Sequence, residues 1–198
     1  RFTQFLVFCS LDFGDTSMVG IDYSRGGKPR YFLWDGNRPL MQVPDEIRQC
    51  VGFLGYDNAE GRRCLAGTIF YFGVPMPGLD RSFIYGITAG HVVTEIGKRS
   101  LNGQIYVRLN LRNAGAEWFA THLDQWIFHP TDSSVDVGVL PGAPPLEAVD
   151  YHWLDSDFVP TGDTLKREGI GVGDEVFLTG LFANHYGRQR NVPIVRVG

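Results

Sequence analysis

The feature that most constrains the fold is a succession of short apolar or alternating runs separated by Gly, Pro, Asn and Asp. All-β barrels and sandwiches have this texture, because their strands are short and their turns need residues that tolerate unusual backbone angles. We expect an all-β chain in which helices are short, with candidates from His91 to Ile96 and over 144–150. The expected strands are 50–56, 64–74, 82–88, 104–111, 118–128, 135–140, 174–182 and 192–197.

Composition and charge narrow the class of partner. The 198 residues are 43% apolar and 20% charged, as in a folded globular protein, and the net charge is −4. An acidic chain is not attracted electrostatically to nucleic acid or to an anionic membrane, so neither is expected as a partner. The apolar runs are far shorter than a transmembrane helix requires, and the run at 5–9 lacks the flanks of a signal peptide.

The three cysteines, Cys9, Cys50 and Cys64, are odd in number, and their spacings match no zinc ribbon and no redox Cys-x-x-Cys motif. We interpret them as thiols in a reducing compartment, and together with the absence of a signal peptide they favour a cytoplasmic protein. No His-x-His, His-Glu-x-x-His or paired-Cys pattern occurs. Neither a metal nor an organic cofactor is predicted, although His122, His129, His152 and His185 and the acids Asp124, Asp150, Asp155 and Asp157 supply possible ligands.

Changes in patterning along the chain suggest four segments. Residues 1–42 have weak periodicity, and Met41 is a plausible natural start, so this segment is interpreted as an N-terminal extension of uncertain status. Residues 43–143 form the first folded unit, which ends where the prolines at 141–145 remove strand hydrogen bonds. Residues 144–172 are interpreted as a linker and 173–198 as the start of a second unit.

His91 is the first candidate for chemistry, because it follows an apolar strand that ends in the small residues Ala89 and Gly90. Small residues let the neighbouring backbone pack closely without displacing the imidazole, which a rigidly held general base requires. A histidine can also take up and return a proton near neutral pH. The alternative is a buried structural histidine bonded to the backbone.

Asp136 is the second candidate, at the head of the apolar run 137–140. A carboxylate buried there is unfavourable unless it is paired, so we expect it to accept a hydrogen bond from an imidazole N–H. That bond would fix the histidine tautomer and stabilise the imidazolium. Asp132 is a rival acid in the polar turn just before it, and a capping or turn role for Asp136 is the alternative.

These residues resemble the trypsin-like, chymotrypsin-fold serine peptidases, in particular the intracellular bacterial type. Thr88-Ala89-Gly90-His91 is similar to the family's Thr-Ala-Ala-His motif, and Asp136-Val137-Gly138-Val139-Leu140 is similar to its Asp-hydrophobic-Ala-hydrophobic-Leu motif. His129-Pro130 stands where the family often has His-Pro, and the motif residues are separated by 45 positions (136 − 91) in the family's order.

The resemblance covers about 43–198 and implies two six-stranded antiparallel β-barrels with the active site between them, the first barrel being complete at 43–143. The segment 173–180 resembles the opening of the second, partial barrel. It further implies that His91 is the general base, that Asp136 orients it, and that the substrate is a peptide or protein. Val92 replaces the cysteine that follows the motif histidine in secreted relatives, so their disulfide is absent here.

The nucleophile is the main departure from the family. The triad template places the serine roughly 90 residues beyond the acid, and 62 residues (198 − 136) follow Asp136. None of the serines present lies in a Gly-x-Ser-Gly setting that would form an oxyanion hole. We expect the serine beyond Gly198 and an inactive fragment without it; the alternative is a peptidase-like binding or structural module. The Arg188 and Arg190 pair is interpreted as a polar hairpin loop near the edge of the cleft.

Overall fold

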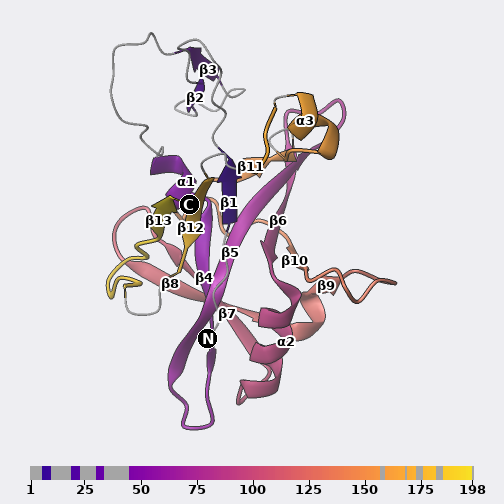
Figure 1. Cartoon of the computed structure of the whole chain (residues 1–198). Coiled ribbons are helices and arrows are strands. Elements are labelled where there is room, and N and C mark those ends of the chain that lie inside the picture. Colours follow the sequence, from indigo (N-terminus) through magenta and orange to yellow (C-terminus); the bar gives the residue numbers. More distant parts are fainter. Residues whose placement is uncertain are drawn as a thin grey trace.

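A computed structural model of the chain describes residues 6–9, 19–22, 30–33, 45–156, 159–167, 169–172, 176–181 and 185–197. The described chain is predominantly β, with one large sheet that carries a helix at its lower end and smaller sheets above and beside it (Figure 1). No helix in these ranges is both long enough and apolar enough to span a membrane.

The large sheet is formed mainly by the segment predicted as the first unit. Its strands are antiparallel and follow the order β8-β7-β4-β5-β6-β10-β9, with the short β11 added in parallel to β5. The strand bounds are β4 Val51–Asp57, β5 Arg63–Pro75, β6 Ser82–Thr88, β7 Gln104–Asn110, β8 Ala116–His122, β9 Ile127–Phe128, β10 Gly138–Pro141 and β11 Leu154–Asp155.

Two smaller sheets complete the described strands. In one, β12 (Val176–Gly180) lies between β1 (Leu6–Cys9) and β13 (Ile194–Val197), so the start of the predicted second unit pairs with a segment of the predicted N-terminal extension. The other sheet is the pair of β2 (Val19–Asp22) and β3 (Arg30–Leu33). Short helical segments are α1 (Asp45–Gln49), η1 (Leu123–Gln125) and α3 (Gly162–Arg167).

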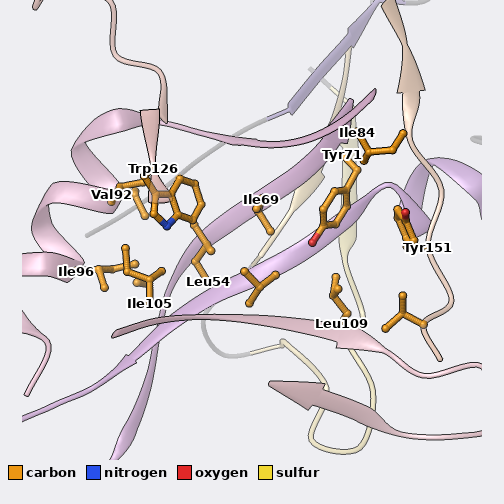
Figure 2. Close-up of a cluster of buried hydrophobic side chains, with 14 residues drawn as sticks. Leu54, Ile69, Tyr71, Ile84, Val92, Ile96, Ile105, Leu109, Trp126 and Tyr151 are labelled. Atoms are coloured by element: carbon orange, nitrogen blue, oxygen red, sulfur yellow. The ribbon is translucent and has the colours of Figure 1, made fainter. Parts of the chain in front are cut away.

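The helix α2 (Gly90–Arg99) begins directly after β6 and packs on the large sheet. It buries Val92, Val93 and Ile96, which recur at helical spacing on one face. Figure 2 shows Val92 and Ile96 beside Trp126, Ile105 and Leu54 in the buried cluster. Because each such side chain contributes about 1.5–3 kcal/mol on burial, this contact holds the start of the helix in a defined position.

The predicted strands in the first unit are confirmed within a few residues, with one division. The run 118–128 is split into β8 and β9 by η1, where the Gln125 side chain accepts the backbone N–H of His122 at 2.8 Å. The predicted helix after His91 is confirmed and extends to Arg99. The run 135–140 yields β10 only from Gly138, which leaves Asp136 in the loop before the strand.

The helix predicted at 144–150 is wrong. The amides of Ala148 and Val149 both bond to the carbonyl of Pro145, and Asp150 then donates its N–H to the carbonyl of Asn110. Pairing with β7 therefore replaces helical hydrogen bonds in this segment. Residues 144–172 also contain β11 and α3, which the irregular sequence pattern did not indicate.

In the part of the chain that the structure describes, no sheet closes on itself, and the fold is mostly β with largely antiparallel sheets. The double barrel and the four segment boundaries stay predictions. The two edges of the large sheet, β8 and β9, are nevertheless consecutive in the chain and joined through η1.

Candidate active site

The pairing of β6 with β10 brings His91 and Asp136 together. The two strands are antiparallel, with Gly138 opposite Thr88. His91 lies three residues after Thr88, in the first turn of α2, and Asp136 lies two residues before Gly138. The two candidate residues, 45 positions apart in sequence, thus meet at the same end of neighbouring strands.

Both carboxylate oxygens of Asp136 contact His91. The imidazole Nδ1 lies 2.5 Å from Oδ2, and the backbone N–H of His91 donates to Oδ1 at 2.7 Å. A carboxylate only accepts hydrogen bonds, so Nδ1 carries the proton, and Nε2 is the ring nitrogen left to take up another. This tautomer is the one required of a general base that works through Nε2.

The same contacts shift the acid toward its charged form. The hydrogen bond from the His91 side chain lowers the pKa of Asp136 below its ordinary value, and the backbone N–H groups of His91 and Gly90 lower it further. Asp136 is therefore a carboxylate at neutral pH and can stabilise an imidazolium beside it.

Asp136 also occupies the N-terminus of α2. The N-cap residue is Ala89, which has no side-chain acceptor, and the helix has no acid in its first turn. Asp136 reaches this terminus from the neighbouring loop and accepts the N–H of His91, where the helix dipole favours a negative charge. A capping role was the alternative expected for Asp136 from the sequence, and the alanine in the N-cap position explains why the acceptor comes from the neighbouring loop.

Two glycines allow the loop and the helix to approach closely. A Cβ on Gly90 would lie 3.3 Å from Oδ1 of Asp136, and one on Gly138 would lie 3.0 Å from a methyl of Val93. An alanine at either position would require its neighbour to move by a few tenths of an ångström, so glycine favours the close approach.

The exposure of the pair differs from the expectation that Asp136 is buried. The side chains of His91 and Asp136 are 50% and 52% exposed. His91 is the partner predicted for Asp136, but the predicted reason, burial of the carboxylate, is wrong. Hydrogen bonds to a half-exposed carboxylate account for the contact. Exposed apolar side chains flank the pair on β9 and on the loop before β10, at Ile127, Phe128, Val135 and Val137.

The rival acid does not contact the histidine in the same way. Asp132 accepts the backbone N–H and the hydroxyl of Ser134 at 2.9 and 2.6 Å, and these bonds lower its pKa. Its role in the structure is to stabilise the turn that precedes Asp136.

The remaining candidates lie apart from one another. Among the described residues, no group of three or more His, Cys, Asp or Glu side chains is arranged to hold a metal ion; Asp157 falls outside them. Cys50 and Cys64 are free thiols, and burial raises the pKa of Cys50 to about 12. The side chain of Cys9 is outside the described set.

The predicted polar loop at Arg188 and Arg190 contacts the large sheet. The carbonyl oxygens of Gly187 and Arg188 accept hydrogen bonds from Arg108 on β7, and Arg190 forms an ion pair with Asp150 at 3.0 Å. The contact of the buried Arg108 with this loop was not predicted; the signal for it was a single arginine within the apolar run 105–109.

Comparisons with known proteins return no relatives. No family model, no curated protein and no solved structure matches this chain. The catalytic roles of His91 and Asp136 therefore stay predictions, supported by sequence motifs and by the geometry described above.

Proposed function

We propose that this chain is most of a trypsin-like serine endopeptidase in which His91 is the general base and Asp136 is its orienting acid. The observation that carries the proposal is the double contact of Asp136 with His91, on Nδ1 at 2.5 Å and on the backbone N–H at 2.7 Å. The nucleophilic serine is expected beyond residue 198.

The strand order supports the fold that this proposal requires. The sheet path has seven strands, and its two edges, β8 and β9, follow one another in the chain; counted as one bent strand, they would close a six-stranded barrel. The strand β12 with its partner β13 agrees with the beginning of a second barrel. The free thiols Cys50 and Cys64 favour a reducing compartment, in line with a cytoplasmic enzyme.

The chemistry follows from the tautomer of His91. Nε2 accepts the hydroxyl proton of the serine as the serine oxygen attacks the peptide carbonyl, and Asp136 stabilises the imidazolium. The imidazolium returns the proton to the leaving amine when the peptide C–N bond breaks, which leaves an acyl-enzyme. Water then attacks the acyl carbon while Nε2 takes its proton, and the serine is regenerated.

The half-exposed pair and its apolar surroundings agree with a site that a second barrel covers. Ile127, Phe128, Val135 and Val137 leave apolar surface open beside the pair in the described chain. The alternative, a peptidase-like module without catalysis, is favoured by one observation: Asp136 caps α2, a structural role that needs no reaction.

The two functions are separated by fluorophosphonate labelling of the full-length product of the natural reading frame. We expect one serine beyond residue 198 to be labelled, and His91→Ala to reduce the labelling rate by a factor on the order of 10³ or more, because the serine then has no base. His122→Ala is the matched control: His122 ends β8 and caps η1, so the change removes an exposed imidazole outside the pair of His91 and Asp136 and should leave the rate unchanged.

Labelling that depends on His91 and not on His122 would support the peptidase. A folded full-length protein that is not labelled, or one labelled equally in both variants, would contradict it and leave the structural module.

A further inference from the structure

The loop between β9 and β10 is held by consecutive local hydrogen bonds. We call residues 129–137 the acid loop. The N–H of Asp132 donates to Nδ1 of His129 at 2.9 Å, and Oδ1 of Asp132 accepts from Ser134. The carbonyl of Asp132 then accepts the N–H of Val135, and the carbonyl of Val135 accepts that of Val137. The sequence of bonds therefore starts at His129 and ends on either side of Asp136.

The first bond fixes the protonation state of His129. A backbone N–H can only donate, so Nδ1 of His129 must be the acceptor, and the ring must be neutral with its proton on Nε2. A protonated imidazole has donors on both nitrogens. Protonation of His129 would therefore turn this bond into two N–H groups that face each other.

Apart from the two bonds that Asp136 accepts from His91, the acid loop is held by the local bonds described above. Residues 129–137 are exposed throughout, in contrast to Gly138, which is buried against Val93. Pro130, directly after His129, restricts the backbone of the turn that this bond closes. Loss of the first bond should thus be felt along the loop as far as Asp136.

We propose that His129 is a pH-sensitive latch. Its neutral ring holds the acid loop through the bond from the Asp132 amide, and protonation of the ring loosens the loop and weakens the contact of Asp136 with His91. The latch goes beyond the proposed function and rests on the geometry of the loop; only its effect on activity depends on a peptidase.

The other charged groups around the acid loop are few. On the loop itself these are Asp132 and Asp136, and β10 carries no titratable side chain. The neighbouring η1 carries Asp124. On α2 the titratable groups are His91, Glu95, Lys98 and Arg99, of which Glu95 is paired with Lys98 and Arg99. Protonation of His91 leaves Nδ1 a donor to Asp136, so it does not open the loop by itself.

The test is an NMR titration of the folded chain between pH 7.5 and 5.5, the range over which imidazoles ordinarily change charge. The ring ¹⁵N shifts of His129 should show the Nε2–H tautomer at pH 7.5. The protection of the Asp132 amide against hydrogen exchange should fall about fivefold as the ring gains its proton, which is the loss of one hydrogen bond of roughly 1 kcal/mol.

His129→Asn is the matched control. Its Oδ1 is the same number of bonds from the backbone as Nδ1, accepts a hydrogen bond and does not titrate in this range. We expect the Asp132 amide to stay protected at both pH values in this variant, and to be unprotected at both in His129→Ala. Exchange of the Nδ1 proton of His91 with water at pH 5.5 should be about twofold or more faster in the wild type than in His129→Asn.

A Nδ1–H tautomer at pH 7.5, or an Asp132 amide that responds to pH equally in His129→Asn, would overturn the latch. Equal exchange of the His91 proton in both proteins would overturn the link to Asp136. In a full-length protein that labels with fluorophosphonate, His129→Asn should extend labelling to lower pH. An unlabelled protein that passes the NMR test would contradict the peptidase and leave the latch standing.

Discussion

The molecule has two polar arrangements that join distant parts of the chain to the large sheet, and they are built in opposite ways. The pair of His91 and Asp136 lies at one end of β6 and β10 with half of each side chain exposed. In the second arrangement, Arg108 and Asn110 on β7 bond to the loop at 185–191, which contributes Asn191. We call these three residues the β7 anchor.

In the β7 anchor, Arg108 and Asn191 are buried and Asn110 is partly buried. Arg108 is 5% exposed, and its guanidinium donates to the carbonyls of Gly187 and Arg188 at 2.8 and 2.6 Å. It also lies between the rings of Trp118 and Tyr186, 5.9 and 5.6 Å from their centroids. Burial lowers the pKa of Arg108 from its ordinary value, because the charged form has lost water around it.

The two asparagines of the β7 anchor bond to each other and to the backbone. Asn191 donates its N–H to Oδ1 of Asn110 at 2.7 Å, and Nδ2 of Asn110 donates to the carbonyl of Asn191 at 3.2 Å. Nδ2 of Asn191 donates to the carbonyl of Arg108 at 2.7 Å. The loop does not pair with β7 as a strand. These hydrogen bonds of the two asparagines link it to β7 instead.

The difference between the two arrangements follows from what each must do. Hydrogen bonds to a buried charge contribute about 1.5–3 kcal/mol each, and removing one partner leaves a desolvated group. An exposed ion pair contributes roughly 0–1 kcal/mol. The β7 anchor therefore stabilises the fold, whereas the His91 and Asp136 pair leaves its imidazole accessible to a reacting group.

Arg108→Ala should have the largest effect on stability. The substitution leaves two partly buried carbonyls without a donor and opens space between Trp118 and Tyr186, so we expect a loss of about 3 kcal/mol or more in the free energy of unfolding. Urea denaturation measures it. The control is Arg62→Ala, because Arg62 forms an exposed pair with Glu60 at 3.6 Å and should lose less than about 0.5 kcal/mol. Equal losses would show that the β7 anchor is not a stabilising feature.

Gly187→Ala should have the next largest effect, and Gly78→Ala separates its two causes. Both glycines have left-handed backbone angles, with φ of +79° and +78°. A Cβ on Gly187 would lie 2.0 Å from the carbonyl oxygen of Arg190, whereas one on Gly78 would meet open space. We expect a loss of about 1 kcal/mol at Gly78 from backbone strain, and about 2 kcal/mol more at Gly187. Similar losses at the two positions would mean that the anchored loop shifts freely.

The two regions also differ in how far the sequence predicts them. The strand β6, the start of α2 and the pairing partner of His91 were all predicted, because a strand pattern, three small residues and a recognisable acid motif are local signals. The register of β6 against β10, which brings Gly138 opposite Thr88, was not predictable, since strand pairing depends on tertiary contacts.

The β7 anchor was not predicted, because its partners are about 80 residues apart and most of its acceptors are backbone carbonyls. Any residue can supply a carbonyl, so the sequence contains no motif for it. The exposure of Asp136 was missed for a related reason. An acid before an apolar run indicates that it has a partner, but how much of its side chain is exposed depends on which other parts of the chain pack over it.

The pH dependence of stability gives the smallest expected effect and the sharpest contrast. The pKa of Asp136 is lowered in the folded chain, chiefly by the His91 side chain. Its contribution is therefore present above the ordinary aspartate value of about 3.9 and is lost as the pH falls through the folded pKa. Because the side chain is half exposed, solvent screening limits this contribution to less than about 1 kcal/mol.

Asp136→Asn should accordingly remove less than about 1 kcal/mol of unfolding free energy at pH 7 and should flatten part of its decline below pH 4. Denaturation at several pH values measures this, with Asp124→Asn, which removes a carboxylate outside the pair, as the matched control. In the full-length protein the same Asp136→Asn change should lower the rate of serine labelling by a factor on the order of 10⁴, because the amide can donate to Nδ1 and stabilise the wrong tautomer. A large loss of stability with little loss of labelling would contradict the difference between the two regions. Asp136 would then act mainly as the cap of α2, and the pair of His91 and Asp136 would stabilise the fold as the β7 anchor does.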